Sequence, residues 1–319
     1  MAEFDLIDHI RRRCDLARAD VRLGIGDDAA VLAVPAGHEL VACTDTLVAG
    51  VHFPHGSAPA DIGWKALAVN LSDLAAMGAT PAWALLALTL PEPDAGFVAG
   101  FAEGFADLAA AHHVALVGGD TTRGPLAITV TAHGFVPPGQ ALRRDGARSG
   151  DEVFVTGTLG DAAAALRLLG TSRAAEFTFA ELRARLDRPT PRVAAGAVLR
   201  ARATACIDVS DGLLADLGHM ANQSGVGIEV EAACLPASPA LLAIFDGRER
   251  CALQLAGGDD YELAFSVPAG QAHDLAQDLA RIGCAATRIG RVVDGTGVRA
   301  LDAHAQPIEL PRRGWEHFA

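Results

Sequence analysis

Residues 60–91 read ADIGWKALAVNLSDLAAMGATPAWALLALTLP, and this stretch decides the fold class. Its first part, residues 60–77, carries apolar residues at helical spacing, so we predict a helix there. Gly78 and Pro81 then break the uncharged run that follows, which would otherwise reach the length of a membrane span. We therefore expect a helix, a turn and a buried strand over 83–90 instead of a transmembrane segment.

The same alternation of strand-like and helical patterns continues on both sides of this stretch. Further strands are predicted over 38–46, 114–117, 126–136, 152–156, 204–208, 226–230, 260–266 and 285–292. Further helices are predicted over 94–113, 161–169, 179–187, 191–202, 212–223 and 270–282. A Pro-Pro-Gly break and a polar, arginine-bearing segment separate two groups of elements. The expected fold class is α/β with two domains, residues 1–140 and 141–319.

Composition excludes several classes of protein. Half of the 319 residues are hydrophobic and 20% are charged, so the chain can bury a large core and is not disordered. A formal net charge of -13 disfavours nucleic acid as the main partner, because Lys and Arg would have to neutralise its phosphates. A phosphorylated small molecule remains possible, since metal ions can supply the missing positive charge. The N-terminus is charged at once and is not typical of a signal peptide, so a soluble, cytoplasmic protein without a membrane segment is expected.

Lys65 is the only lysine, and no glycine-rich loop precedes it, which excludes a P-loop nucleotide-binding site. We expect it on the polar side of its helix. The six cysteines include no Cys-x-x-Cys pair, so a zinc or redox motif is not indicated. They are interpreted as small buried apolar residues in a reducing compartment.

Aspartates gather in glycine-flanked turns and at the ends of predicted strands, in segments such as Gly24-Ile-Gly-Asp-Asp and Ile207-Asp-Val-Ser-Asp-Gly. Each segment alone is also typical of an ordinary turn or a helix N-cap, and Asp211 could simply cap the helix that follows it. Together they suggest one partly buried cleft, in which carboxylates stay close only if they protonate or share cations. A ligand set of oxygens favours Mg²⁺.

Six blocks occur in an order that identifies a family: Gly24-Ile-Gly-Asp-Asp-Ala, Thr44-Asp-Thr-Leu-Val-Ala-Gly-Val-His-Phe, Lys65-Ala-Leu-Ala-Val-Asn-Leu-Ser-Asp-Leu-Ala-Ala-Met-Gly-Ala, Gly118-Gly-Asp-Thr-Thr-Arg-Gly, Asp208-Val-Ser-Asp-Gly-Leu and Gly257-Gly-Asp-Asp-Tyr-Glu-Leu. The chain resembles the thiamine-monophosphate kinases of the aminoimidazole-ribonucleotide-synthetase-like superfamily over almost its whole length. The resemblance implies ATP- and Mg²⁺-dependent, direct in-line phosphorylation of thiamine monophosphate to thiamine diphosphate. It also implies a homodimer in which the N-terminal metal- and ATP-binding domains share a β-barrel, with a C-terminal α/β domain on the substrate side.

The resemblance carries over to individual residues of this sequence. Positions that match the family's metal ligands, for several Mg²⁺ ions, are Asp28, Thr44, Asp45, Asp73, Asp120, Asp208 and Asp211. The five that we expect to serve catalysis directly are Asp45, Asp73, Asp120, Asp208 and Asp211, the first three in a shared cluster to which Thr44 gives a hydroxyl or backbone oxygen. Positions that match ATP-binding residues are Gly119, Asp120, Arg144 and Ser210. Positions that match substrate contacts are His52, Asp259 and Trp315.

Three departures from the family pattern touch the expected site. Asp259 stands where many relatives have Glu, Cys43 where some have Ser, and Trp315 where some have Tyr. Two alternatives stay open: a related enzyme with another acceptor, and a non-catalytic module that binds Mg·ATP. Selenophosphate synthetase is disfavoured because Cys14 lacks a glycine-rich setting.

Overall fold

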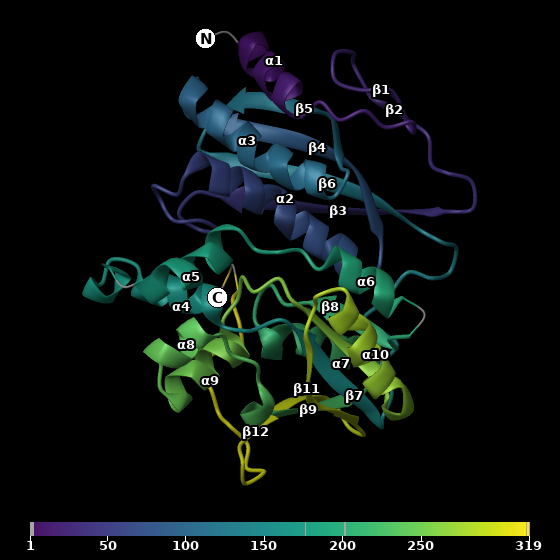
Figure 1. The fold of residues 1–319 in the computed structure, drawn as a ribbon, viewed down its shortest axis with the longest axis vertical. Helices are drawn as coiled ribbons and strands as arrows, with labels where there is room; N and C mark the ends of the chain where they lie inside the picture. Colours follow the sequence, from purple (N-terminus) through teal and green to yellow (C-terminus); the bar gives the residue numbers. More distant parts are fainter. Residues whose placement is uncertain (1–2, 176, 201, 317, 319) are drawn as a thin grey trace. The chain divides into compact units, whose positions relative to one another are not determined.

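The computed structural model describes residues 3–175, 177–200, 202–316 and 318 (Figure 1). Contacts divide the chain into two compact units, which are described separately. The first unit comprises Met1–Leu74 and Ala79–Gly139, and the second comprises Ala75–Gly78 and Gln140–Ala319. The short segment Ala75–Gly78 at the end of a first-unit helix therefore packs with the second unit.

A four-stranded sheet in the order β3-β6-β4-β5 forms the centre of the first unit (Figure 1). Its strands are β3 (Glu39–Val48), β4 (Thr80–Leu90), β5 (Ala115–Arg123) and β6 (Ala127–Val136). The β4–β5 pair is parallel, whereas β6 runs antiparallel to both β3 and β4. A short antiparallel pair, β1 (Val21–Leu23) with β2 (Val31–Leu32), accompanies the sheet.

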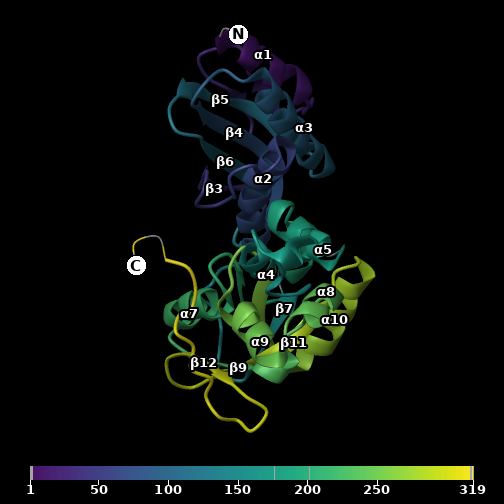
Figure 2. The same cartoon turned by 90° about the vertical axis from the view of Figure 1, so that its left-hand side faces the viewer.

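Three helices belong to this unit: α1 (Glu3–Arg13), α2 (Pro59–Ala76) and α3 (Ala95–Ala111). Figure 2 shows α2 and α3 against the same face of the sheet. The two helices approach closely because glycines face the crossing: a Cβ on Gly104 would lie 1.7 Å from the carbonyl oxygen of Ala60, and one on Gly63 would lie 2.0 Å from that of Phe101. Asp94 caps α3 by accepting the N–H groups of Gly96 and Phe97.

A six-stranded sheet in the order β12-β9-β11-β7-β10-β8 forms the second unit. Its strands are β7 (Asp151–Thr156), β8 (Ala205–Asp208), β9 (Gly227–Glu231), β10 (Leu263–Pro268), β11 (Ala286–Val293) and β12 (Gly297–Leu301). Its helices are α4 (Asp161–Leu168), α5 (Phe177–Asp187), α6 (Val193–Leu199), α7 (Leu213–Ser224), α8 (Pro239–Ile244), α9 (Gly247–Ala256) and α10 (Ala272–Arg281), with 3-10 turns at Ser172–Ala175, Ala232–Cys234 and Ala269–Gln271.

Both faces of the larger sheet are buried. Val153, Val155 and Ile207 join a core that includes the apolar side of α7, while the intervening Phe154 and Cys206 join a second core with α6 and α10. Successive residues of a strand point to opposite faces, which explains this division. A sheet that is buried on both faces is expected to have strands with apolar residues on both sides.

Two buried carboxylates fix the chain just before β10. Asp260, 3% exposed, accepts the N–H of Gly160 at 2.9 and 3.0 Å, at the start of α4. Glu262, 0% exposed, accepts the Thr156 hydroxyl at 2.7 Å and the guanidinium groups of Arg185 and Arg192 at 2.5 to 2.6 Å. These contacts anchor the segment that precedes β10 to α4, α5 and β7.

The main elements predicted from the pattern are confirmed, with shifted ends. The helix–turn–strand reading of 60–91 is confirmed by α2 and β4. No helix within the described part of the chain is long and apolar enough to cross a membrane. The pattern missed the terminal and short elements α1, β1, β2, α8, α9 and β12. It also placed a strand start at 260, whereas β10 begins at Leu263 because the preceding residues Asp259 and Tyr261 have positive φ.

The prediction that Lys65 lies on the polar side of its helix is wrong. Its side chain is 2% exposed, and Nζ donates to the carbonyl oxygen of His52 at 3.0 Å. The reason is that α2 is buried almost all round, so its polar residues are enclosed with the apolar ones. The prediction that the cysteines are buried is confirmed for Cys14, Cys206 and Cys284, whereas the other three are half-buried. All six thiols are free.

The glycine contact between α2 and α3 predicts a sharp response to one methyl group. Gly104→Ala should lower the free energy of unfolding by about 1–3 kcal/mol, because the helices must separate to admit the Cβ. Gly218→Ala, within α7, meets nothing within 4 Å and should be neutral or stabilising by up to about 1 kcal/mol. Urea unfolding followed by tryptophan fluorescence measures both. Equal effects of the two substitutions would contradict this close packing.

Asp260 predicts a pH effect on stability. Burial raises the pKa of Asp260 well above its ordinary value, although the N–H of Gly160 opposes the shift. The folded protein therefore keeps a proton that the unfolded chain releases above about pH 4, so ionisation of this group costs stability as the pH rises. Asp260→Asn should remove this dependence, reducing the loss of unfolding free energy by up to about 1.4 kcal/mol per pH unit. Urea unfolding at pH 5, 6 and 7 tests it, and identical pH slopes in both proteins would contradict it.

Candidate functional site

Asp45 and Asp73 form a carboxylate pair between β3 and α2. Their side chains are in hydrogen-bond contact, and burial raises the pKa of Asp45 while this contact lowers it. Cys43 lies on the same side of β3, with Sγ donating to the carbonyl oxygen of Asn70 at 3.3 Å. Burial, then the charges of Asp73 and Asp45, raises the pKa of the Cys43 thiol, so the thiol stays neutral beside the pair.

Thr44 points to the opposite face of the same strand. Its hydroxyl donates to the carbonyl oxygen of Val130 at 3.2 Å and lies 3.0 Å from the hydroxyl of Thr131. Alternation along a strand accounts for the separation from Asp45. The sequence analysis expected either the hydroxyl or the backbone oxygen of Thr44 to bind metal. The hydroxyl is directed away from the carboxylate pair, so the backbone carbonyl oxygen remains the candidate metal ligand.

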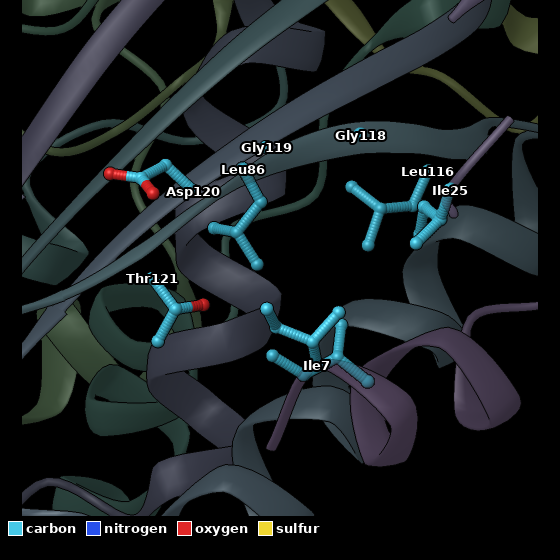
Figure 3. A pocket seen from close by; sticks show the side chains of 9 residues that line it. Ile7, Ile25, Leu86, Leu116, Gly118, Gly119, Asp120 and Thr121 are labelled. Atoms are coloured by element: carbon cyan, nitrogen blue, oxygen red, sulfur yellow. The ribbon is translucent and has the colours of Figure 1, made fainter. Parts of the chain in front are cut away.

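Asp120 and Asp45 lie on strands that are separated within the sheet of the first unit. The ladder aligns Asp45 with Val130, Val130 with Leu86 and Leu86 with Gly119, so three strand spacings, about 14 Å, separate β3 from β5 along the sheet. Figure 3 shows Leu86 and Thr121 turned toward Ile7 of α1, whereas Asp120 points away from them. The expected cluster of Asp45, Asp73 and Asp120 is thus not assembled by one copy of the first unit. The sequence pattern placed Asp120 in a turn after a strand, and this is wrong: Asp120 lies within β5.

Asp120 lines a different hollow of the first unit, together with Asp28 and Gly119. This pocket, of about 1090 Å³, lies between the segment 25–32 and the strands β4, β5 and β6. Gly119 has φ 150°, and a Cβ there would lie 1.8 Å from the carbonyl oxygen of Leu86, so only glycine fits. A smaller, apolar hollow of about 60 Å³ adjoins it beside Ile7 and Leu116 (Figure 3).

His52 sits in a tight turn after β3. Its Nδ1 accepts the N–H of Val48 at 3.0 Å, so the neutral ring carries its proton on Nε2. The turn is closed by the N–H of Gly50 on the carbonyl oxygen of Phe53, whose side chain is buried. These contacts give the imidazole a defined orientation.

In the second unit, Asp208 ends β8, and Ser210 and Asp211 lie in the loop that leads into α7. One carboxylate oxygen of Asp216 accepts the N–H groups of Ser210, Asp211 and Gly212 at 3.0, 3.1 and 3.1 Å. Burial, then the charges of Asp208 and Asp211, raises the pKa of Asp216 to about 7. The residue at the N-cap of α7 is Gly212, so the alternative that Asp211 caps this helix is wrong.

Asp259 and Trp315 are tied to this loop through the backbone. The N–H of Asp259 donates to the carbonyl oxygen of Ser210 at 2.8 Å, and the N–H of Trp315 donates to that of Asp211 at 2.9 Å. The Tyr261 hydroxyl donates to Oδ1 of Asp259 at 3.1 Å. The second unit therefore brings Ser210, Asp211, Asp259 and Trp315 together.

Trp315 borders an open pocket of about 640 Å³ between α7 and residues 311–316. Its side chain is 51% exposed, so an aromatic face is accessible to a ligand. Arg144, near the start of the main segment of the second unit, has an exposed side chain, while its carbonyl oxygen accepts the hydroxyl of Ser224.

Sequence reasoning found the loops but missed Asp216 and Tyr261, which hold them in place. Asp216 gave a signal as an acidic residue in the first turn of α7. Tyr261 was visible as the only tyrosine of the chain, two residues after Asp259. Among the residues that the structure describes, no three His, Cys, Asp or Glu side chains lie together as a metal site. Each unit thus holds carboxylate groups of its own, and the single cleft expected from the sequence stays a prediction.

Comparison with known proteins identifies the family. Residues 26–136 match the N-terminal domain of the AIR synthase related proteins, and residues 148–302 match the C-terminal domain. The chain is 45% identical to the thiamine-monophosphate kinase of Escherichia coli (strain K12), covering 99% of this chain and 98% of the relative.

Solved structures agree with this match. The crystal structure of thiamine-monophosphate kinase from Stenotrophomonas maltophilia K279a superposes with a TM-score of 0.87 at 53% identity, covering 94% of this chain and 96% of that one. The structure described as AaThiL complexed with AMPPCP and TMP superposes with a TM-score of 0.77 at 35% identity, covering 99% and 97%. The chain therefore belongs to the thiamine-monophosphate kinase family of AIR synthase related proteins.

Proposed function

We propose that this protein transfers the γ-phosphoryl group of ATP to thiamine monophosphate, giving thiamine diphosphate and ADP. The observation that carries the proposal is 45% identity to a thiamine-monophosphate kinase along nearly the whole length of both chains. The relative with AMPPCP and TMP bound supports the choice of both substrates.

The donor chemistry of the carboxylate groups fits Mg²⁺. Asp45 and Asp73 are two oxygen donors in contact and partly withdrawn from water, a pairing that a hard cation stabilises. Asp208 and Asp211 form the corresponding group of the second unit, where Asp216 binds the loop N–H groups. Asp28, Asp120 and the Thr44 carbonyl complete the proposed ligands. Bound Mg²⁺ ions would neutralise phosphate charge and orient the reacting groups.

The residues proposed for ATP are Gly119, Asp120, Arg144 and Ser210. Gly119 lines the pocket and has no side chain between β5 and β4, and the exposed Arg144 guanidinium offers several donors to phosphate oxygens. Ser210 lies in the loop held by Asp216, so its backbone has a fixed position.

The residues proposed for thiamine monophosphate are His52, Asp259 and Trp315. His52 offers its Nε2 proton as a hydrogen-bond donor. Asp259, held by Tyr261, offers a carboxylate to a cationic or amino-bearing part of thiamine, and the exposed ring of Trp315 offers a stacking surface. Because Trp315 replaces Tyr of some relatives, it keeps the ring and changes its polar end.

The proposed chemistry is a direct in-line transfer. An oxygen of the thiamine monophosphate phosphate forms a bond to the γ-phosphorus as the bond from that phosphorus to the oxygen bridging to the β-phosphate breaks, so ADP leaves with that electron pair. The acceptor phosphate is mostly ionised at neutral pH, its second pKa being about 6, so no strong general base is needed. The protein contributes positioning and charge neutralisation.

We also propose a homodimer in which two four-stranded sheets close into one barrel. Leu40, Thr44 and Thr46 are exposed on the face of β3 opposite α2, and Leu40 is 47% exposed. A second copy would bury this face.

A product assay tests the activity. With thiamine monophosphate, ATP and Mg²⁺, equal amounts of thiamine diphosphate and ADP should form, and EDTA should abolish both. Asp45→Asn should lower kcat about 100-fold or more, because half of the carboxylate pair is lost. Asp274→Asn, an exposed carboxylate on α10, is the matched control and should keep wild-type turnover. Chromatography of the products measures each variant.

The outcome separates the alternatives. Formation of ADP without thiamine diphosphate would indicate a related enzyme whose phosphate acceptor is another molecule. Binding of Mg·ATP without any product would favour a non-catalytic module. Wild-type turnover in Asp45→Asn would show that Asp45 is not a metal ligand of the reaction.

Light scattering tests the dimer. The wild-type protein should have a mass of twice 32.9 kDa. Leu40→Asp should shift it toward the monomer, because the carboxylate would be buried in the interface. Leu242→Asp, at a side chain 53% exposed on α8, should leave the dimer intact. A monomeric wild-type protein at micromolar concentration would refute the shared barrel.

A further inference from the structure

We infer that Lys65 is a positioning residue that holds His52 in place for its contact with thiamine monophosphate. The inference rests on the proposed function and assigns a role to a residue that none of the proposed contacts uses. Lys65 is the only lysine of the chain, and it lies in the interior of the first unit.

Burial makes the Lys65 side chain unusual. It is 2% exposed and is among the largest fully enclosed side chains of the protein. An ammonium group is costly to remove from water unless it is hydrogen-bonded, so a buried lysine implies specific acceptors. One of these is the carbonyl oxygen of His52, at 3.0 Å from Nζ.

The hydrogen bond of Lys65 connects α2 to the turn at His52, the proposed substrate contact. Lys65 lies on α2, which is fixed by α3 and the sheet, whereas residues 48–53 form the turn after β3. Within the turn, Val48 donates its N–H to Nδ1 of His52, and its carbonyl oxygen accepts the N–H of His52 at 3.0 Å. The backbone and ring of His52 are thus tied to one end of the turn, and Lys65 ties the His52 carbonyl to the helix.

Backbone hydrogen bonds and a left-handed glycine set the local fold of the turn. Gly50 has φ 78°, and a Cβ there would lie 2.6 Å from Nε2 of His55, so the backbone is tightly folded. The buried side chain of Phe53 fixes the far end of the turn. Lys65 adds a charged hydrogen bond between these two anchors, and it ties the His52 backbone, and with it the oriented imidazole, to α2.

A double-mutant cycle on the full-length enzyme tests the inference. Lys65→Met keeps a similar length and an apolar fit but removes the donor, so the protein should stay folded. It should raise KM for thiamine monophosphate about tenfold, as expected for a lost charged hydrogen bond, with a much smaller change in KM for ATP. In a His52→Ala background the same substitution should raise KM no further, because Lys65 acts through His52.

The control is Ser266→Ala, which removes a buried hydroxyl that contacts Thr204 at 2.7 Å in the second unit. It should lower the melting temperature without changing KM for thiamine monophosphate. The inference would be overturned if Lys65→Met raised KM by the same factor in the wild-type and His52→Ala backgrounds. An unchanged KM in the wild-type background would overturn it as well. If His52→Ala itself leaves KM unchanged while product still forms, the His52 contact and this inference both fail and the kinase activity stands.

Discussion

Carboxylates held close together are the constraint on which the proposed site depends. Two such charges 4 Å apart repel by about 4 kcal/mol at an effective dielectric constant near 20. The structure meets this cost in two ways. Asp216 and Asp260 accept backbone N–H groups, and Glu262 is enclosed by two arginines and a hydroxyl. The Asp45–Asp73 pair instead consists of two acceptors in contact, an arrangement that a shared proton or cation stabilises.

This contrast separates supporting carboxylates from the proposed metal ligands. Asp216 uses one oxygen to hold three consecutive N–H groups of the loop that carries Asp211. Asp260 and Glu262 alternate with Asp259 and Tyr261 along the chain, so the buried pair anchors a segment that carries Asp259, the proposed substrate contact, and Tyr261, which binds it. Sequence motifs with several adjacent acidic residues therefore contain carboxylates that bind the protein's own backbone N–H groups or arginines beside carboxylates that we propose as ligands.

Much of the fold was predictable because it follows local pattern. The apolar spacing of residues 60–77 and the break at Gly78 predicted α2 and β4, and Asp94 signalled the start of α3. The strand order β3-β6-β4-β5 was not predictable, because it depends on contacts between distant segments. That order separates Asp45 from Asp120. The burial of Lys65 was not predictable either, because segments distant in the sequence cover α2. A lysine in a helix is normally read as marking its polar face, and this helix has none.

The distribution of positive charge explains why such a site needs so many carboxylates. Both proposed substrates are anions, and the chain has a formal net charge of -13. The only lysine is buried against a carbonyl oxygen, so the flexible cationic side chains available to phosphates are arginines. An arginine fork can orient a phosphate but does not bring two phosphates together. Divalent cations do so, and they are retained by clustered oxygen donors. The acidic loops and the acidic surface are therefore compatible with anionic substrates, because the attraction is local and requires the cations to be bound first.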